Sequence, residues 1–147
     1  RERALALGAT DAIDPTADDV AFAVLDLTPG GIGVDWAFDA AGRSSLVNTG
    51  IDATRKGGTT VMVGIPGLDD PLTMPLPAGF AFAGKHLMGC LLGSCNSLRD
   101  IPRFIDLAQS GRLDLAALVT ATRPLEEINE AFDDLRTTTG IRTVIEL

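Results

Sequence analysis

The sequence predicts an α/β protein built around a parallel sheet, and three observations support this prediction. Apolar runs of strand length occur at 34–38, 59–65 and 86–93, and continuous runs of this kind are typical of strands buried on both faces. Segments with apolar residues at helical spacing precede, separate and follow these runs. Strands that alternate with helices are joined by crossovers, which make the strands parallel and the connections right-handed.

Each element is placed by its apolar spacing and by the turn residues that end it. Helices are expected at 3–7, 17–27, 43–55, 98–110 and 124–136. Strands, some with their closing turns, are expected at 10–14, 34–39, 59–65, 86–93, 118–125 and 141–147. The stretch 66–77 contains four prolines in twelve residues, so we expect an irregular connection there.

Two sets of apolar side chains are expected to be buried. The strand set comprises Val34, Trp36 and Phe38. The second set is the apolar stripe of the last helix, and it comprises Leu125, Ile128, Phe132 and Leu135. Each set recurs at the period of its element, so its members share one face.

The composition argues against several classes of partner. The formal net charge is −8, and an acidic chain repels phosphate backbones, so no nucleic acid partner is expected. Cys90 and Cys95 are too few for a disulfide framework, so we expect reduced thiols and a cytoplasmic location. No apolar run has the length of a bilayer span, so no membrane partner is expected. Because the chain starts inside a predicted helix, we expect it to be the C-terminal part of a longer protein.

No residue pattern predicts a catalytic or metal site. His86 is the only histidine and lies in an apolar run, whereas zinc needs three or four convergent ligands. Gly31 and Gly33 look like the start of a dinucleotide fingerprint, but Trp36 stands where the third glycine is required. The stretch also precedes a strand instead of following one. We therefore expect no catalytic residue and no metal ligand in this chain.

The ends of the predicted strands carry the signal for a ligand site. Three of them end in small or glycine-bearing sequences, at 39–43, 63–66 and 91–94. In open parallel sheets, ligands bind beyond the carboxyl ends of the strands. Arg43, at a helix start, suits an anion. The alternative is that these are ordinary strand ends and that Arg43 is a solvated surface residue; the pattern leaves both open.

Five segments together resemble one known family in their order and spacing. They are FDAAGR, TTVMVGIP, GSCNSLRDIPRFIDLAQSGRLDLAALVT, PLEEINEAFDDL and GIRTVIEL. The chain is similar in these segments to zinc-dependent alcohol dehydrogenases of the medium-chain dehydrogenase/reductase superfamily, in particular to their class III-like branch. The resemblance implies an incomplete Rossmann-type parallel sheet in residues 1–92, without its first strands and its glycine fingerprint. It implies the C-terminal part of the catalytic domain in residues 93–147.

The resemblance also implies which residues contact the cofactor. They are Ala40, Ala41, Arg43, Val63, Gly64, Ile65, Cys90, Leu91, Leu92 and Arg142. Most of them would lie against the nicotinamide half, whereas Arg142, with help from Arg43, would reach the pyrophosphate. The implied cofactor is NAD, with NADP left open. The implied parent enzyme transfers hydride between an alcohol, an aldehyde or a thiol adduct and this cofactor, with zinc held outside this chain. The chain alone is expected to be inactive.

A sheet without its first strands has structural consequences. The strand at 10–14 would have no native neighbour, and the strand at 34–38 would become an apolar edge, which is a hazard for aggregation. We expect residues 1–30 to attach loosely or beside that edge, or another chain to cover it. In the family the strand at 86–92 pairs with its twofold mate, which implies a homodimer. Two other functions stay open: a non-catalytic nucleotide-binding or dimerisation module, and a zinc-free medium-chain reductase.

Overall fold

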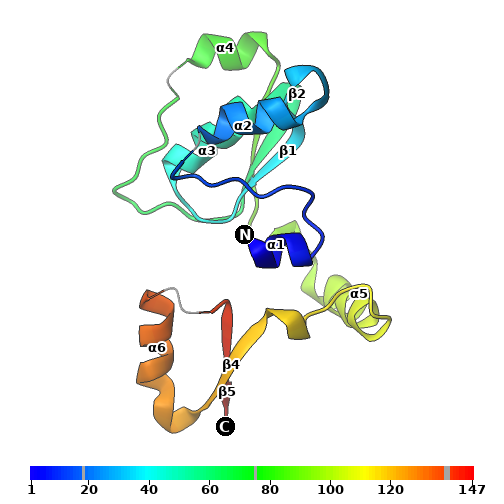
Figure 1. Cartoon of the computed structure of the whole chain (residues 1–147), viewed down its shortest axis with the longest axis vertical. Coiled ribbons are helices and arrows are strands. Elements are labelled where there is room, and N and C mark those ends of the chain that lie inside the picture. The colour runs from blue at the N-terminus through cyan, green and yellow to red at the C-terminus, as the bar shows by residue number, and fades with distance from the viewer. Residues whose placement is uncertain (18, 75, 138–139) are drawn as a thin grey trace. The chain divides into compact units, whose positions relative to one another are not determined.

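The computed structural model describes residues 1–17, 19–74, 76–137 and 140–147. The chain divides into two compact units, Arg1–Ser94 and Cys95–Leu147, which are described here one at a time (Figure 1). Within the described ranges, the strands form a three-stranded sheet in the first unit and a two-stranded sheet in the second. Every strand pair in these two sheets is parallel. The α/β prediction is therefore confirmed.

The elements follow the expected order with shifted ends. The helices are α1 (Glu2–Ala6), α2 (Val20–Leu27), α3 (Ser44–Ala53), α4 (Pro77–Phe82), α5 (Ser97–Gln109) and α6 (Ile128–Arg136). The strands are β1 (Val34–Asp39), β2 (Thr54–Met62), β3 (His86–Gly89), β4 (Val119–Pro124) and β5 (Arg142–Glu146). The short helix α4 was not expected. No helix in the described ranges is long and apolar enough to cross a bilayer.

The first unit has its core between α3 and the sheet of order β1-β2-β3. Val47 of α3 is fully buried, and Ile51 and Ala53 are nearly so. Gly50 lets the helix approach closely, because a Cβ atom there would lie 3.1 Å from the Thr60 methyl group. Helix α2 packs beside α3 (Figure 1). One face of the sheet is therefore covered.

The opposite face of this sheet is largely exposed, so the prediction that Trp36 and Phe38 are buried is wrong. Trp36 is 55% exposed and Phe38 66%, while Met88, on the same face of β3, is 49% exposed. The two aromatic rings stack on each other at a centroid distance of 6.4 Å. Thr59 and Val61 of the central strand β2 lie on the same face and are buried, whereas β1 and β3 are the two edges of the sheet. The exposed side chains of this face therefore belong to the edge strands.

The predicted strand at 10–14 does not form. Residues 11–14 are irregular, and Asp14 instead accepts hydrogen bonds from the backbone and hydroxyl of Thr16. A strand needs a partner for its backbone groups, and no described strand pairs with this segment. The N-terminal segment attaches to the unit through α2 instead. Asp18, at the start of the predicted helix 17–27, lies outside the described residues.

The second unit contains α5 and a β4-α6-β5 crossover with parallel strands. The apolar stripe of α6 faces a groove shared with β5, but it is not a core. Within the stripe Leu125, Phe132 and Leu135 are 50–62% exposed, and only Ala131 of this helix, among the described residues, is buried. The prediction of a buried stripe is wrong, because two short strands offer too little surface to enclose it.

Candidate functional site

The carboxyl ends of β1, β2 and β3 lie at one edge of the first sheet. Strand pairing aligns Asp39 with Met62 and Met62 with Gly89, and these are the last residues of the three strands. Both β2 and β3 end earlier than the sequence predicted, so residues 63–65 and 90–92 lie beyond the sheet. Because the strands are parallel, the segments that follow them start at the same edge. This edge brings together every cofactor residue implied by the resemblance except Arg142.

Gly42 and Gly64 bring two of these segments into direct backbone contact. A Cβ atom on Gly64 would lie 2.1 Å from the Gly42 nitrogen, and one on Gly42 would lie 2.7 Å from the Ile65 carbonyl oxygen. Gly42 also has a φ angle of +70°, which residues with side chains rarely adopt. The segment after β1 therefore rests on the segment after β2, with no room for a side chain between them.

An open hollow lies between the segments after β2 and β3. It is lined by residues 62–66, 89–91 and Ser94, so it includes five of the implied cofactor residues. Ile65 and Leu91 are 82% and 74% exposed. Their apolar surface suits the face of a flat ring. Ala40 and Ala41 line a neighbouring hollow between β1 and the helices α2 and α3.

The chain after β3 has an unusual backbone. Leu92, Gly93 and Ser94 have φ angles of 49°, 70° and 52°, all in the left-handed region. Leucine and serine rarely adopt this conformation. Backbone strain of this kind clusters at ligand-binding and switch regions, and here it follows Cys90 and Leu91 directly. It is therefore a second structural feature that marks this edge.

Asp70 occupies the helix start at which Arg43 was expected to help bind an anion. Arg43 is exposed and occupies the N-cap position of α3. Ser44 donates its backbone N–H to the Asp70 carboxylate at 3.0 Å and its hydroxyl to the Asp70 carbonyl at 2.7 Å. The protein thus supplies its own anion at the first turn of α3. An anionic ligand held by Arg43 would share the helix N-terminus with that carboxylate. Sequence reasoning missed Asp70 because it lies 26 positions after Ser44, in a stretch predicted only as irregular.

Arg142 belongs to the second unit, where it is the first residue of β5. The Thr120 hydroxyl oxygen accepts hydrogen bonds from the backbone N–H groups of Ile141 and Arg142, at 2.9 Å and 3.2 Å. Arg142 itself is exposed. Its backbone is thereby fixed while its guanidinium group remains accessible to an anion.

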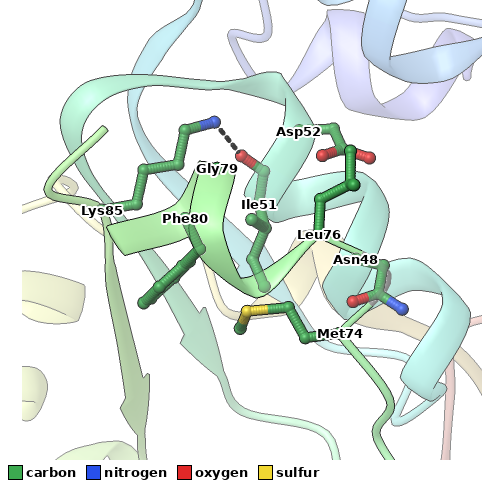
Figure 2. Close-up of a pocket in the computed structure, with 8 residues that line it drawn as sticks. All are labelled: Asn48, Ile51, Asp52, Met74, Leu76, Gly79, Phe80 and Lys85. Atoms are coloured by element: carbon green, nitrogen blue, oxygen red, sulfur yellow. Dashed lines mark hydrogen bonds between the residues drawn. The ribbon is translucent and has the colours of Figure 1, made fainter. Parts of the chain in front are cut away.

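A third hollow of the first unit lies between α3 and α4 (Figure 2). Lys85 directs its ammonium group toward the last turn of α3 and donates a hydrogen bond to the Ile51 carbonyl oxygen. Burial lowers the pKa of Lys85, and the charge of nearby Asp52 partly offsets this effect. A cation at a helix C-terminus is favourable, and Lys85 directly precedes β3. This contact therefore fixes the position of the residue before β3 relative to the end of α3.

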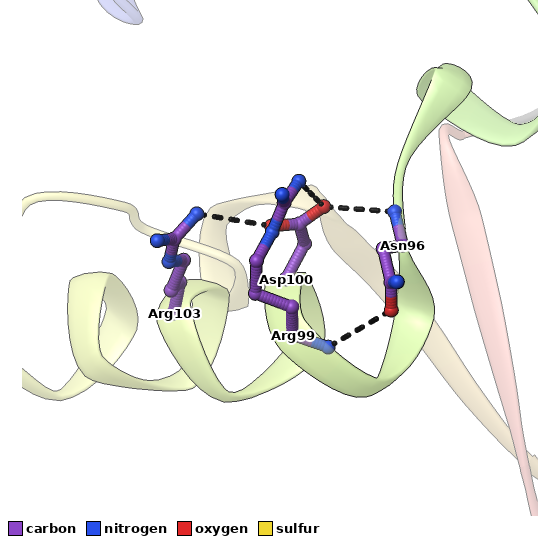
Figure 3. A network of polar contacts seen from close by, with 4 residues as sticks. All are labelled: Asn96, Arg99, Asp100 and Arg103. Carbon is purple, nitrogen blue, oxygen red and sulfur yellow. Dashed lines mark hydrogen bonds and ion pairs between the residues drawn. The ribbon is translucent and has the colours of Figure 1, made fainter.

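A buried carboxylate organises the start of α5 in the second unit (Figure 3). Asp100 is 8% exposed, and it accepts hydrogen bonds from two nitrogens of Arg99, from Arg103 and from the Asn96 backbone. The hydrogen bonds from Arg99 are the main reason that the pKa of Asp100 is lowered, and the same contact raises the pKa of Arg99. The Asn96 side chain caps the helix through the Arg99 N–H. This network is structural, because the carboxylate is fully engaged by the helix itself.

The described part of the chain does not fit a zinc ion. It contains no group of three or more His, Cys, Asp or Glu side chains that could hold a metal. His86 lies exposed on β3, Cys90 is half-buried, and Cys95 is exposed in the other unit. No step that involves a metal is therefore derived from these residues.

Comparison with known proteins identifies the family. Residues 1–110 match the family model described as zinc-binding dehydrogenase. The chain is 39% identical to the NDMA-dependent alcohol dehydrogenase of Amycolatopsis methanolica, over 99% of this chain and 39% of that protein. It is 29% identical to the alcohol dehydrogenase class-3 of Myxine glutinosa, with the same coverage of both chains.

The fold is also that of a solved relative. The crystal structure of benzyl alcohol dehydrogenase from Acinetobacter calcoaceticus superposes with a TM-score of 0.92 at 29% sequence identity. The match covers 99% of this chain and 39% of that one, and the matched part is Rossmann-like. The chain thus spans about 39% of the length of these relatives. By sequence and fold together, the chain belongs to the zinc-binding dehydrogenase family.

Proposed function

We propose that the natural protein carrying this chain transfers a hydride between an alcohol or aldehyde and a nicotinamide cofactor. In this proposal the chain supplies the nicotinamide side of the site. The observation that carries the proposal is the edge where the segments 40–43, 63–65 and 90–92 meet. Apart from Arg43 its residues are small or apolar, and it lies where open parallel sheets bind their ligands.

The residues at this edge fit a nicotinamide cofactor. Ile65 and Leu91 offer exposed apolar surface to the face of the ring, and the backbone of Val63 and Gly64 lies beside them in the same hollow. When bound, NAD supplies the site that accepts or donates the hydride. The protein residues orient the ring and exclude water from its face. We assign Arg142, with help from Arg43, to the pyrophosphate, and we propose NAD as the cofactor with NADP left open.

We propose zinc for the natural protein and not for this chain alone. The family name and the relatives support a zinc-dependent enzyme, whereas the described residues of this chain offer no ligand set. We therefore propose that residues outside this chain hold the metal. Metal analysis of the natural protein distinguishes this reading from a zinc-free reductase of the same family.

We further propose a homodimer formed through residues 86–92 and a cytoplasmic protein. β3 is an edge strand of the described sheet, so one side of its backbone is available to another strand. A twofold mate would satisfy these groups by an isologous contact. Light scattering that finds only monomers would defeat the dimer. The cytoplasmic location rests on the low cysteine count.

The test of the function is a titration of the natural protein, expressed from its full reading frame, with NADH. Saturable binding together with NAD-dependent alcohol oxidation and bound zinc is the expected result. Binding without turnover would favour the nucleotide-binding module. An absence of NADH binding would refute the proposal.

A further inference from the structure

We propose that Asp39 is the positioning residue that holds the nicotinamide side of the site together. It joins the segment after β1 to the segment after β2 through its side chain and its backbone. This inference rests on the proposed function, because it concerns how the same edge is held in shape. Asp39 itself is buried, with 7% exposure, so its role is to hold the residues that touch the ring.

The carboxylate fixes the turn that follows β1. One carboxylate oxygen accepts hydrogen bonds from the backbone N–H groups of Ala41 and Gly42, at 3.0 Å and 3.2 Å. The other oxygen lies 3.1 Å from the same Gly42 nitrogen. Hydrogen bonds to a charged acceptor are stronger than those to a neutral one. The turn that carries Ala40 and Ala41 is thereby held to the end of the strand.

The backbone of the same residue holds the neighbouring segment. The Asp39 carbonyl oxygen accepts hydrogen bonds from the N–H groups of Val63 and Gly64, at 2.9 Å and 2.8 Å. Asp39 is thus bonded to both segments, and the close contact of Gly42 with Gly64 lies between them. A shift of the turn at 41–42 would be passed directly to residues 63–65.

The Asp39 carboxylate acts on the turn beyond the sheet and not on the pairing of the strand itself. The strand already pairs with β2 as far as Asp39 and Met62, so the sheet does not depend on the carboxylate. What depends on it is the shape of the turn beyond the sheet. Asp35, on the same strand, provides the contrast. Its side chain is 66% exposed and forms an ion pair with Arg55 at 2.6 Å, away from the strand end.

The experiment uses the full-length natural protein and two ligands. Asp39→Asn keeps one carbonyl oxygen as an acceptor, Asp39→Ala removes both oxygens, and Asp35→Asn is the control with the same change of charge. NADH and ADP-ribose are titrated into each variant, because ADP-ribose lacks the nicotinamide ring. We expect the NADH dissociation constant to rise roughly tenfold in Asp39→Asn and roughly a hundredfold in Asp39→Ala. ADP-ribose affinity should fall by a clearly smaller factor than NADH affinity in both, because ADP-ribose loses only the contact of Arg43 beyond the turn, and Asp35→Asn should change the affinity for neither ligand.

The outcomes separate this inference from the function on which it rests. A wild-type protein that binds neither ligand would refute the proposed function and the inference together. A wild-type protein that binds NADH, with Asp39 variants that bind it equally well, would overturn the inference alone. An equal loss of NADH and ADP-ribose affinity would also overturn it, because a general loss of structure does not discriminate between the ligands. If Asp39→Ala does not fold, the NADH and ADP-ribose affinities of Asp39→Asn test the inference by themselves.

Discussion

In a Gly64→Ala variant, one methyl group is added where the segment after β2 meets the segment after β1. Gly64 lies beyond the last residue of β2, so the sheet itself is not altered. The new carbon would point at the backbone of Gly42 and Ala41. Neither neighbour has a side chain that could rotate away at that point, because the contacts are with backbone atoms.

The geometry sets the size of the effect. The added Cβ atom would lie 2.1 Å from the Gly42 nitrogen and 2.6 Å from its Cα atom, whereas ordinary van der Waals contacts lie at 3.4–4 Å. The two segments must therefore separate by about 1 Å or more, since protein interiors have little free space. Overpacking of this kind costs about 1–3 kcal/mol in the free energy of unfolding. Residues 63–65 shift with the displaced segment, so NADH affinity should fall by roughly tenfold or more, which is equivalent to about 1.4 kcal/mol or more.

Two assays on the full-length protein check both effects. Denaturant unfolding measures the free energy, and a fluorescence titration measures the NADH dissociation constant. Gly79→Ala is the control, because a Cβ atom there would have its nearest neighbour at an ordinary 3.7 Å, inside α4. That variant should bind NADH normally and gain about 0.5–1 kcal/mol from the loss of a helix glycine.

One result would refute the reasoning. If Gly64→Ala unfolds at the same denaturant concentration as the wild-type protein and binds NADH with unchanged affinity, the two segments are not in contact in solution. The hollow would then not depend on the approach of Gly42 and Gly64. An effect of equal size in Gly79→Ala would point to the same conclusion.

Three further predictions concern single side chains. Thr60→Val should raise the free energy of unfolding by about 1 kcal/mol, because the buried Thr60 hydroxyl has no hydrogen-bond partner among the described residues; thermal unfolding checks this. Arg43→Ala and Arg142→Ala should each weaken NADH binding by about 1.5–3 kcal/mol through loss of a charged hydrogen bond, and unchanged affinity in both would defeat the pyrophosphate assignment. Asp100→Asn should make the free energy of unfolding depend less steeply on pH at acidic pH. The pKa of Asp100 is lowered by Arg99, so its stabilisation is complete above the ordinary value of 3.8 and is lost as the pH falls through the lower folded pKa. If the free energy of unfolding of the variant falls as steeply with decreasing pH as that of the wild-type protein, Asp100 does not have this role.

The α/β class and the order of the elements could be predicted from the sequence because both depend on local signals. Apolar runs, helical spacing and turn residues placed β1, α3 and β4 within a few residues of their observed bounds. The strand ends at 39–43, 63–66 and 91–94 were also found in this way. A parallel sheet necessarily brings such ends to one edge, so no distance was needed to infer it.

Burial was predicted less well, because burial depends on which neighbour is present. Trp36 and Phe38 have the pattern of a buried strand, yet they are exposed because β1 is an edge strand of the sheet. The stripe of α6 has the right spacing but faces only two short strands. Residues 11–14 have the composition of a strand but no partner to pair with.

The sequence by itself determined the fold class, the family resemblance and the small residues at the strand ends, because these depend on residue type and local spacing. Only the tertiary structure decided that Asp39 holds two segments, that Gly42 rests on Gly64, and that Asp70 occupies the start of α3. These contacts join residues that are distant in the chain, and their geometry depends on backbone positions that local spacing does not define. The physical reason is that a carboxylate can lie on a solvated surface or in a buried turn whose N–H groups offset the cost of burial, and only the surrounding structure distinguishes the two.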